Sequence, residues 1–246
     1  MAGDDRLRPL LDVDDLDGSE ARLREALRGE VTDEGQAEVL TQLARVASFR
    51  EEFDLAHSLV DQADRLADQS GVAHTRVVLE RGRIMRRQGD TVAALPLFEQ
   101  AYEAALASGD HYIAGDAAHM CALAGDTVFW TERGLALADR YDAASSWRGT
   151  LLINLGRWQW NEGATAEALT SFEAALEARE QEPRTPFLRE FARFGVARSL
   201  RALGRPAEAI PLLEQVVAWA AESEFTGREV EEFNAELAAA YQDFGT

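Results

Sequence analysis

The sequence predicts an all-α protein built from repeated pairs of helices, and three observations lead to that prediction. Several segments of the chain align with one another at fixed spacings of small and large apolar residues. Those spacings are three and four residues, the period of an α-helix, and a glycine breaks the helix in front of each set. No segment shows the alternation of apolar and polar residues that is typical of a strand.

Three segments carry the repeat most clearly: QGDTVAALPLFEQAYEAA from Gln88, NEGATAEALTSFEAALEA from Asn161 and ALGRPAEAIPLLEQVVAW from Ala202. Each has a turn glycine, a small residue five places later, and a large apolar residue four places beyond that. The turn glycines are Gly89, Gly163 and Gly204, the small residues Ala94, Ala168 and Ala209, and the large residues Phe98, Phe172 and Leu213. Each segment therefore predicts a turn and a helix whose small residue allows a neighbouring helix to approach closely.

A first helix precedes each turn, with a small residue seven places before the glycine: Gly82, Gly156 and Ala197. This pattern resembles the tetratricopeptide repeat, in which paired helices stack into a solenoid. The resemblance implies a right-handed α-solenoid of about five helix-turn-helix repeats. The turn positions 89, 125, 163, 204 and 245 are 36, 38, 41 and 41 residues apart. These periods exceed the usual length of about 34 and are similar to the longer, kinesin-light-chain-like type.

The register predicts one solenoid domain over residues 19–246, preceded by an acidic, mobile segment at residues 1–18. The expected repeats are residues 34–70, 72–108, 110–141, 145–180 and 186–223, followed by a capping helix at 227–244. Two copies depart from the pattern. Glu51 stands where the first repeat would have its turn glycine, and around Gly125 the large Trp130 and the small Gly134 exchange places.

The charge of the chain limits its partners. Its 246 residues carry a formal net charge of −19, and all 25 basic residues are arginine. Such a balance argues against nucleic acid and against an anionic membrane as general partners. The one cysteine, Cys121, excludes an internal disulfide and fits a reducing compartment. The acidic N-terminus does not resemble a signal peptide, so we expect a cytoplasmic protein.

No set of residues predicts catalysis, a cofactor or a metal site. Cys121 and His119 are two residues apart, so on a helix they point in different directions, and we interpret Cys121 as a core residue. His111 and His119 can share a helix face, but two histidines without a further matched ligand do not make a zinc site. The sequence therefore predicts a protein that is not an enzyme.

The candidate binding site is a row of arginines. In tetratricopeptide solenoids the first helices line the concave surface, and the resemblance implies that residues just after each mid-helix small residue face the groove. The predicted groove residues are Arg45, Arg83, Arg87, His119, Arg157, Trp160, Phe194, Arg198 and Arg201. Guanidinium groups bind carboxylates in a bidentate manner, and aromatic rings hold apolar side chains.

We therefore predict a scaffold that binds an acidic or carboxylate-bearing peptide or protein segment in this groove. Two other functions stay open: a peptide or small-ligand sensor that acts with a separately encoded output partner, and a structural protein that self-associates, so a homo-oligomer is also open. The arginines can instead pair with glutamates of their own or the next repeat. A further hypothesis is that the acidic residues Asp12, Asp14, Asp15 and Asp17 fold back onto the groove and block it.

Overall fold

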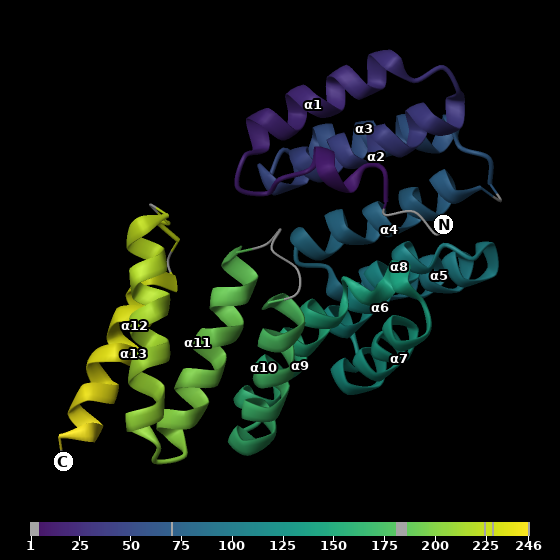
Figure 1. The fold of residues 1–246 in the computed structure, drawn as a ribbon. Helices are drawn as coiled ribbons and strands as arrows, with labels where there is room; N and C mark the ends of the chain where they lie inside the picture. The colour runs from purple at the N-terminus through teal and green to yellow at the C-terminus, as the bar shows by residue number, and fades with distance from the viewer. Residues whose placement is uncertain (1–4, 70, 181–185, 224, 228, 246) are drawn as a thin grey trace. The chain divides into compact units, whose positions relative to one another are not determined.

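A computed structural model describes residues 5–69, 71–180, 186–223, 225–227 and 229–245 (Figure 1). These residues form thirteen α-helices and one short 3-10 helix, and no strand occurs among them. The predicted all-α solenoid is therefore confirmed. The chain divides into two compact units, residues 1–145 and 146–246, which we call the N-terminal and C-terminal units and describe separately. One solenoid domain over residues 19–246 stays a prediction.

The N-terminal unit contains three helical hairpins, in which α2 packs on α3, α4 on α5 and α6 on α7. Its elements are η1 (Arg8–Leu10), α1 (Leu16–Gly29), α2 (Asp33–Phe49), α3 (Phe53–Leu66), α4 (Val72–Arg87), α5 (Thr91–Ser108), α6 (His111–Ala124), α7 (Thr127–Arg140) and α8 (Asp142–Ser145). Aspartates fix where three of these helices begin, because the side chains of Asp90, Asp110 and Asp126 accept hydrogen bonds from backbone N–H groups of the first turn.

The C-terminal unit contains two hairpins, α9 with α10 and α11 with α12, followed by the single helix α13, which packs on α12. Its elements are α9 (Arg148–Asn161), α10 (Thr165–Glu180), α11 (Pro186–Ala202), α12 (Pro206–Glu222) and α13 (Glu229–Phe244). The first helices of the repeats are thus α2, α4 and α6 in one unit, and α9 and α11 in the other.

Four of the five described turns between paired helices contain a left-handed residue, whereas Gly125 between α6 and α7 has φ −134°. Gly89, Gly163 and Gly204 have φ of 94°, 79° and 75°. Glu51 adopts the same conformation with φ 62°, although it carries a side chain. The turn geometry is therefore kept in the first repeat, where the glycine is missing, at a cost in backbone strain.

The repeat packs a large ring against a missing side chain. A Cβ atom on Gly82 would lie 2.5 Å from the ring of Phe98. In the C-terminal unit the ring of Phe172 lies between two glycines, and added Cβ atoms would lie 2.9 Å from it at Gly156 and 2.4 Å at Gly195. Both phenylalanines are buried. The small and large positions of the sequence pattern are therefore partners in close helix packing.

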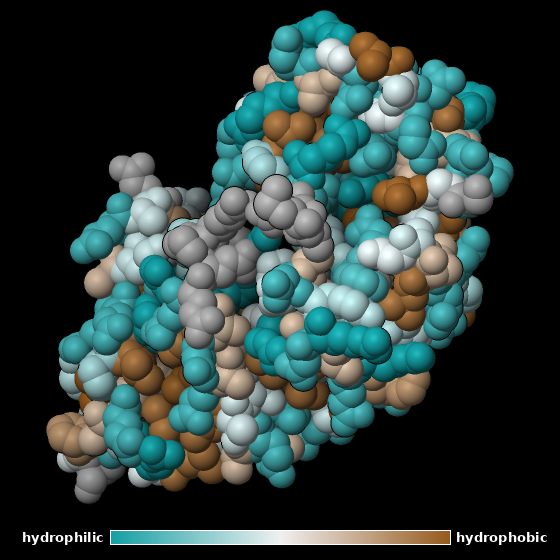
Figure 2. All heavy atoms as spheres, turned by 45° about the vertical axis from the view of Figure 1, so that its right-hand side comes forward, coloured by the Kyte–Doolittle hydropathy of each residue, from teal (hydrophilic) through white to brown (hydrophobic). Residues whose placement is uncertain are grey.

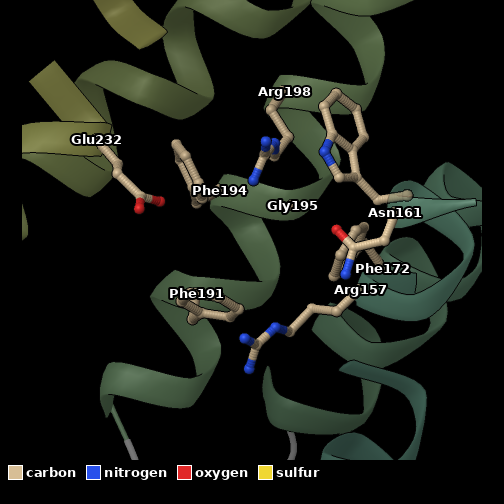
Figure 3. A pocket seen from close by; sticks show the side chains of 9 residues that line it. Arg157, Asn161, Phe172, Phe191, Phe194, Gly195, Arg198 and Glu232 are labelled. Carbon is tan, nitrogen blue, oxygen red and sulfur yellow. The ribbon is translucent and has the colours of Figure 1, made fainter. Parts of the chain in front are cut away.

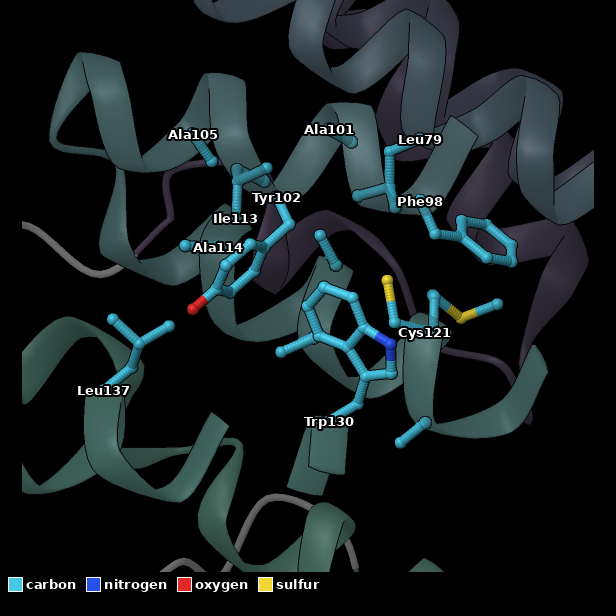
Figure 4. Close-up of a cluster of buried hydrophobic side chains, with 14 of the residues drawn as sticks. Leu79, Phe98, Ala101, Tyr102, Ala105, Ile113, Ala114, Cys121, Trp130 and Leu137 are labelled. Atoms are coloured by element: carbon cyan, nitrogen blue, oxygen red, sulfur yellow. The ribbon is translucent and has the colours of Figure 1, made fainter. Parts of the chain in front are cut away.

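Trp130 and Gly134, the large and small residues that exchange places in the third repeat, are also buried. Trp130 is buried and its ring meets Tyr102 edge-on, with centroids 5.2 Å apart. Figure 4 shows Trp130 within the cluster that also contains Tyr102 and Cys121. Gly134 is buried on the same helix. Cys121 is free and buried, and burial raises the pKa of its thiol to about 12, as expected for a core cysteine.

The structure differs from the expectation of a mobile segment over residues 1–18. Residues 1–4 lie outside the described residues, but residues 5–18 pack on the N-terminal unit. Leu7 is 1% exposed and joins the apolar core of α1 and α2. Asp15 caps α1 through the backbone N–H of Gly18, and Asp17 pairs with Arg50. Burial of leucines inside this acidic stretch anchors it, which its charge alone does not reveal.

The face shown in Figure 2 is mostly hydrophilic, with apolar side chains in separate patches. Among the helices that the structure describes, none combines the length and the apolar composition needed to cross a membrane.

Candidate functional site

The predicted groove residues all lie on first helices of the repeats. The N-terminal unit carries Arg45 on α2, Arg83 and Arg87 on α4, and His119 on α6; the C-terminal unit carries Arg157 and Trp160 on α9, and Phe194, Arg198 and Arg201 on α11. The two sets have different surroundings. A single row of arginines that runs through both units stays a prediction.

In the N-terminal unit the arginines are held by buried carboxylates. Arg45 donates to both oxygens of Glu80, with its Nη2 2.8 Å from Oε2 and its Nε 3.1 Å from Oε1. Arg83 pairs with Asp116, and its Nε lies 3.4 Å from Glu80. Glu80 and Asp116 are 1% and 2% exposed. These four side chains form one ionic cluster that spans α2, α4 and α6.

The pKa shifts in this cluster follow from charge pairing. Burial works against the ionised form of Asp116, but the guanidinium groups of Arg83 and Arg45 outweigh it and lower its pKa. Burial likewise disfavours the charged form of Arg45, and the carboxylates of Glu80 and Asp116 nevertheless raise its pKa. His119 also interacts with Asp116. The charges of Arg45 and Arg83 are thus already matched inside the protein. For these two arginines the structure shows the alternative that the sequence left open, ion pairs with carboxylates of the next repeat.

Arg87 has an aromatic neighbour. Its guanidinium carbon lies 4.1 Å from the centre of the Phe49 ring, within the range of a cation–π contact. Burial, with a contribution from Arg83, lowers its pKa.

In the C-terminal unit two arginines line a pocket together with aromatic rings (Figure 3). The pocket has a volume of about 190 Å³. Its lining residues are Arg157, Trp160, Asn161, Phe172, Phe191, Phe194, Gly195, Arg198 and Glu232. Figure 3 shows Arg198, Phe194 and Phe191 on α11 facing Arg157 and Asn161 on α9, with Glu232 entering from α13.

These two arginines rest on rings rather than on carboxylates. The guanidinium carbon of Arg198 lies 4.0 Å from the centre of a ring of Trp160 and 5.4 Å from that of Phe194. That of Arg157 lies 5.6 Å from the centre of Phe191. Within the described part of the chain, neither arginine has an ion-pair partner, unlike the neighbouring Arg193 and Arg201.

The guanidinium group of Arg198 is also partly removed from solvent. Its Nε atom is buried and has no hydrogen-bond partner among the described residues. Burial lowers the pKa of Arg198, and the more distant carboxylates of Glu236 and Glu232 offset this only in part. A carboxylate that entered the pocket would therefore meet a desolvated guanidinium group, where a charge-assisted hydrogen bond is strong.

Arg201 and Phe194 behave differently from the prediction for a free groove. Arg201 pairs with Glu236, and its Nη1 lies 2.9 Å from Asp243. Phe194 lines the pocket but is only 2% exposed and packs on Phe233 with ring centres 4.9 Å apart. Phe194 is therefore part of the pocket wall and does not extend toward a ligand.

The pocket also depends on residues that the sequence did not predict to line the groove. Gly195 and Phe172 form part of its lining, and Glu232 is its acidic member. Gly195 stands two places before the mid-helix small residue of its repeat, where α4 and α6 carry Glu80 and Asp116. The sequence therefore contains a signal for the difference between the two units: this position is acidic in α4 and α6 and is glycine in α11.

No cluster of three or more metal-binding side chains occurs within the part of the chain that the structure describes.

The hairpins, their glycine turns and their ring-to-glycine packing define a helical-repeat protein. A family model of the tetratricopeptide repeat matches residues 151–185, which include α10 and most of α9. The repeat formed by α9 and α10 thus matches the tetratricopeptide repeat, in agreement with the resemblance found in the sequence.

Solved structures with a similar fold include three that cover most of this chain. The apo form of the quorum sensor NprR from B. thuringiensis is 12% identical with a TM-score of 0.63, over 94% of this chain and 64% of that protein. BtubC (BKLC) from P. vanneervenii is 16% identical with a TM-score of 0.63, over 91% and 94% of the two chains. The assembly chaperone of RpL4 (Acl4) is 13% identical with a TM-score of 0.51, over 98% and 95%.

This chain therefore spans less than two thirds of the quorum sensor. No curated protein matches the chain by sequence. At these identities the similarities establish the fold.

Proposed function

We propose that the protein is a non-enzymatic scaffold that binds a peptide or protein segment, and that the pocket between α9, α11 and α13 receives a carboxylate of that segment. One observation carries the proposal: Arg157 and Arg198 line a shared pocket and have no ion-pair partner among the described residues, in a chain of net charge −19. Acidic residues are abundant, so two neighbouring arginines without an ion-pair partner mark a site for an anionic group.

The dimensions and walls of the pocket favour one residue of a peptide. Pockets for drug-sized ligands usually enclose roughly 300–1,000 Å³, and this one is smaller, at about 190 Å³. The rings of Trp160, Phe191 and Phe194 offer contact to an apolar side chain next to the carboxylate. An acidic residue beside an apolar one, or a C-terminal apolar residue with a free carboxylate, has both features.

The fold supports a binding role. The similar structures include, by their names, a quorum sensor and an assembly chaperone. The cytoplasmic location is part of the same proposal, supported by the free, buried Cys121. A sensor is the second candidate, because the pocket is lined by residues of four helices, α9, α10, α11 and α13, so a ligand that bridges them can change their spacing. Compaction on ligand addition in small-angle scattering would favour the sensor.

Peptide binding by matched variants tests the proposal. We would screen short peptides with acidic residues or free C-termini, together with their amidated or amide-substituted forms, by fluorescence anisotropy. Replacement of Arg157 and Arg198 by serine should weaken binding by about 10-fold or more for each arginine, as expected for loss of one partner of a desolvated ion pair. Binding should also weaken as the salt concentration rises.

Arg205→Ser is the matched control. Arg205 is an exposed arginine that pairs with Glu208, and it lies just after α11, the helix that carries Arg198. This variant should leave binding unchanged. A peptide that binds the Arg157→Ser, Arg198→Ser variant as tightly as the wild type would exclude the pocket as the binding site. Association that strengthens with salt would instead indicate apolar self-assembly.

A further inference from the structure

A second surface of the protein already holds a peptide segment, namely the start of the chain itself. Residues 5–11 contact the first helices of all three repeats of the N-terminal unit. Asp5 pairs with Arg76 on α4, Arg6 lies 3.5 Å from Glu38 on α2, and Arg8 lies 5.9 Å from the ring of Tyr112 on α6. In Figure 1 the purple N-terminal segment runs from η1 toward α4.

The contact with Arg76 is a buried, bidentate ion pair. Arg76 donates from Nη2 to Oδ1 of Asp5 at 2.8 Å and from Nη1 to Oδ2 at 3.2 Å. Both side chains are 7% exposed. A pair in this geometry gives direction as well as attraction, in the way that a carboxylate of a bound peptide would be recognised.

An apolar anchor follows two residues later. Leu7 is 1% exposed and belongs to the core cluster of α1 and α2, with Leu10 and Leu11 packed against it. The segment itself has only a three-residue 3-10 helix, and Arg22 donates to the carbonyl oxygen of Leu10. It is thus short, almost without regular structure, and held by side chains, as a docked peptide is.

The surface is wider than the segment that occupies it. A pocket of about 420 Å³ adjoins Asp5 and Arg76, and His111 and Tyr112 line its other side. The Nδ1 atom of His111 is buried without a hydrogen-bond partner among the described residues, while its ring stacks on Tyr141. The face therefore retains an unused polar group next to the occupied position.

We infer that the face formed by α2, α4 and α6 is a second peptide-binding site, and that residues 5–11 are its intramolecular ligand. The segment it fits has a carboxylate two residues before a leucine, which matches Asp5 and Leu7 here. A partner segment with this pattern binds by displacing residues 5–11. The aspartates expected to block a groove, Asp12, Asp14, Asp15 and Asp17, are not the ones that do so.

The test uses the full chain and a peptide in solution. An N-acetylated peptide of residues 5–12 is labelled, and its binding is measured with the wild type and with the Asp5→Asn, Leu7→Ser variant, which releases the tethered segment. The tethered ligand acts at a high effective concentration, so the wild type should bind the peptide at least about 100-fold more weakly than the released variant. A peptide with asparagine and serine at the two key positions should not bind.

Two controls define the result. Asp14→Asn changes an exposed aspartate of the same stretch, outside the predicted contact, and should behave like the wild type. The Arg157→Ser, Arg198→Ser changes, added to the released variant, should not alter peptide affinity, which separates this site from the C-terminal pocket. Equal binding by the wild type and the released variant would overturn the inference, as would no binding by a released variant whose helical circular dichroism is intact.

If the released variant loses its helical signal, Asp5→Asn alone keeps the test open, because it removes only the ion pair. Trypsin cleavage after Arg6 then reports release of the segment. Cleavage should be about 10-fold faster in Asp5→Asn than in Asp14→Asn, as expected when a charged partner of a buried pair is lost. Equal cleavage rates would show that Asp5 does not hold the segment and would reject the inference.

Discussion

The two units place arginine at equivalent positions of the repeat and surround it differently. In the N-terminal unit Arg45 and Arg83 meet Glu80 and Asp116, both buried on neighbouring first helices. In the C-terminal unit Arg157 and Arg198 meet aromatic rings and line a pocket. The same residue at the same repeat position is thus a structural ion pair in one unit and a candidate binding group in the other.

The position two residues before each mid-helix small residue accounts for this difference at Arg157. This position holds Glu80 in α4 and Asp116 in α6, whereas α11, the first helix after Arg157, has Gly195. On α13, the helix after Arg198, it holds Glu236, which pairs with Arg201. An arginine on one first helix reaches this position on the next helix, as Arg45 does to Glu80 and Arg83 to Asp116. Gly195 offers no carboxylate, and its missing side chain leaves space for the ring of Phe172.

Removal of the charge of Asp116 should have the largest effect. Asp116→Asn leaves Arg45 and Arg83 with one carboxylate between them, in a site where both acids are buried. Breaking a buried pair in this way costs about 3 kcal/mol of unfolding free energy. The matched change in the C-terminal unit, Glu232→Gln at an exposed residue, should cost less than about 1 kcal/mol. Hydrogen exchange resolves the two units, and equal losses of protection would remove the distinction drawn between them.

Acid should weaken the N-terminal unit through the same residue. The pKa of Asp116 is lowered in the folded protein despite its burial, because Arg83 and Arg45 stabilise the carboxylate. Its contribution to stability is therefore complete above the unfolded pKa of about 4 and is lost as the pH falls through the lower folded value.

Amide protection in α4 and α6 should consequently fall as the pH drops below about 4. The pH dependence should be shallower in Asp116→Asn, which has no group to titrate at this position. If the variant and the wild type show the same slope, other carboxylates cause the acid sensitivity.

The smallest expected effect concerns the turns. Glu51 has φ 62°, whereas the corresponding turn of the C-terminal unit has a glycine, Gly163, at φ 79°. A left-handed residue with a side chain costs about 1–2 kcal/mol and a glycine loses about 0.5–1 kcal/mol more in conformational entropy, so Glu51→Gly should stabilise the protein by about 0.5 kcal/mol.

Gly163→Ala is the reverse change and should destabilise by about 1 kcal/mol. Urea denaturation of both variants gives the comparison. Destabilisation by Glu51→Gly would mean that the side chain of Glu51 contributes more than its backbone conformation costs.

The repeats could be predicted because their signals are local. The spacing of Gly82, Gly89 and Phe98 follows from helical geometry and from the left-handed turn, and both are properties of short segments. The structure shows this spacing as a ring packed on a glycine. The site could be predicted only in part. The predicted groove residues that line the pocket are Arg157, Trp160, Phe194 and Arg198, and the remaining lining residues are Asn161, Phe172, Phe191, Gly195 and Glu232.

The sequence by itself determined the helices, their turns and which positions carry arginine, because helical periodicity and glycine conformation act within a few residues. Only the tertiary structure decided which arginines are matched and where the start of the chain lies. Arg45 and Glu80 are 35 residues apart, and Asp5 and Arg76 are 71 apart. Whether such distant charges meet depends on how helices stack and on what apolar residues such as Leu7 bury beside them, and burial decides the free energy of an ion pair.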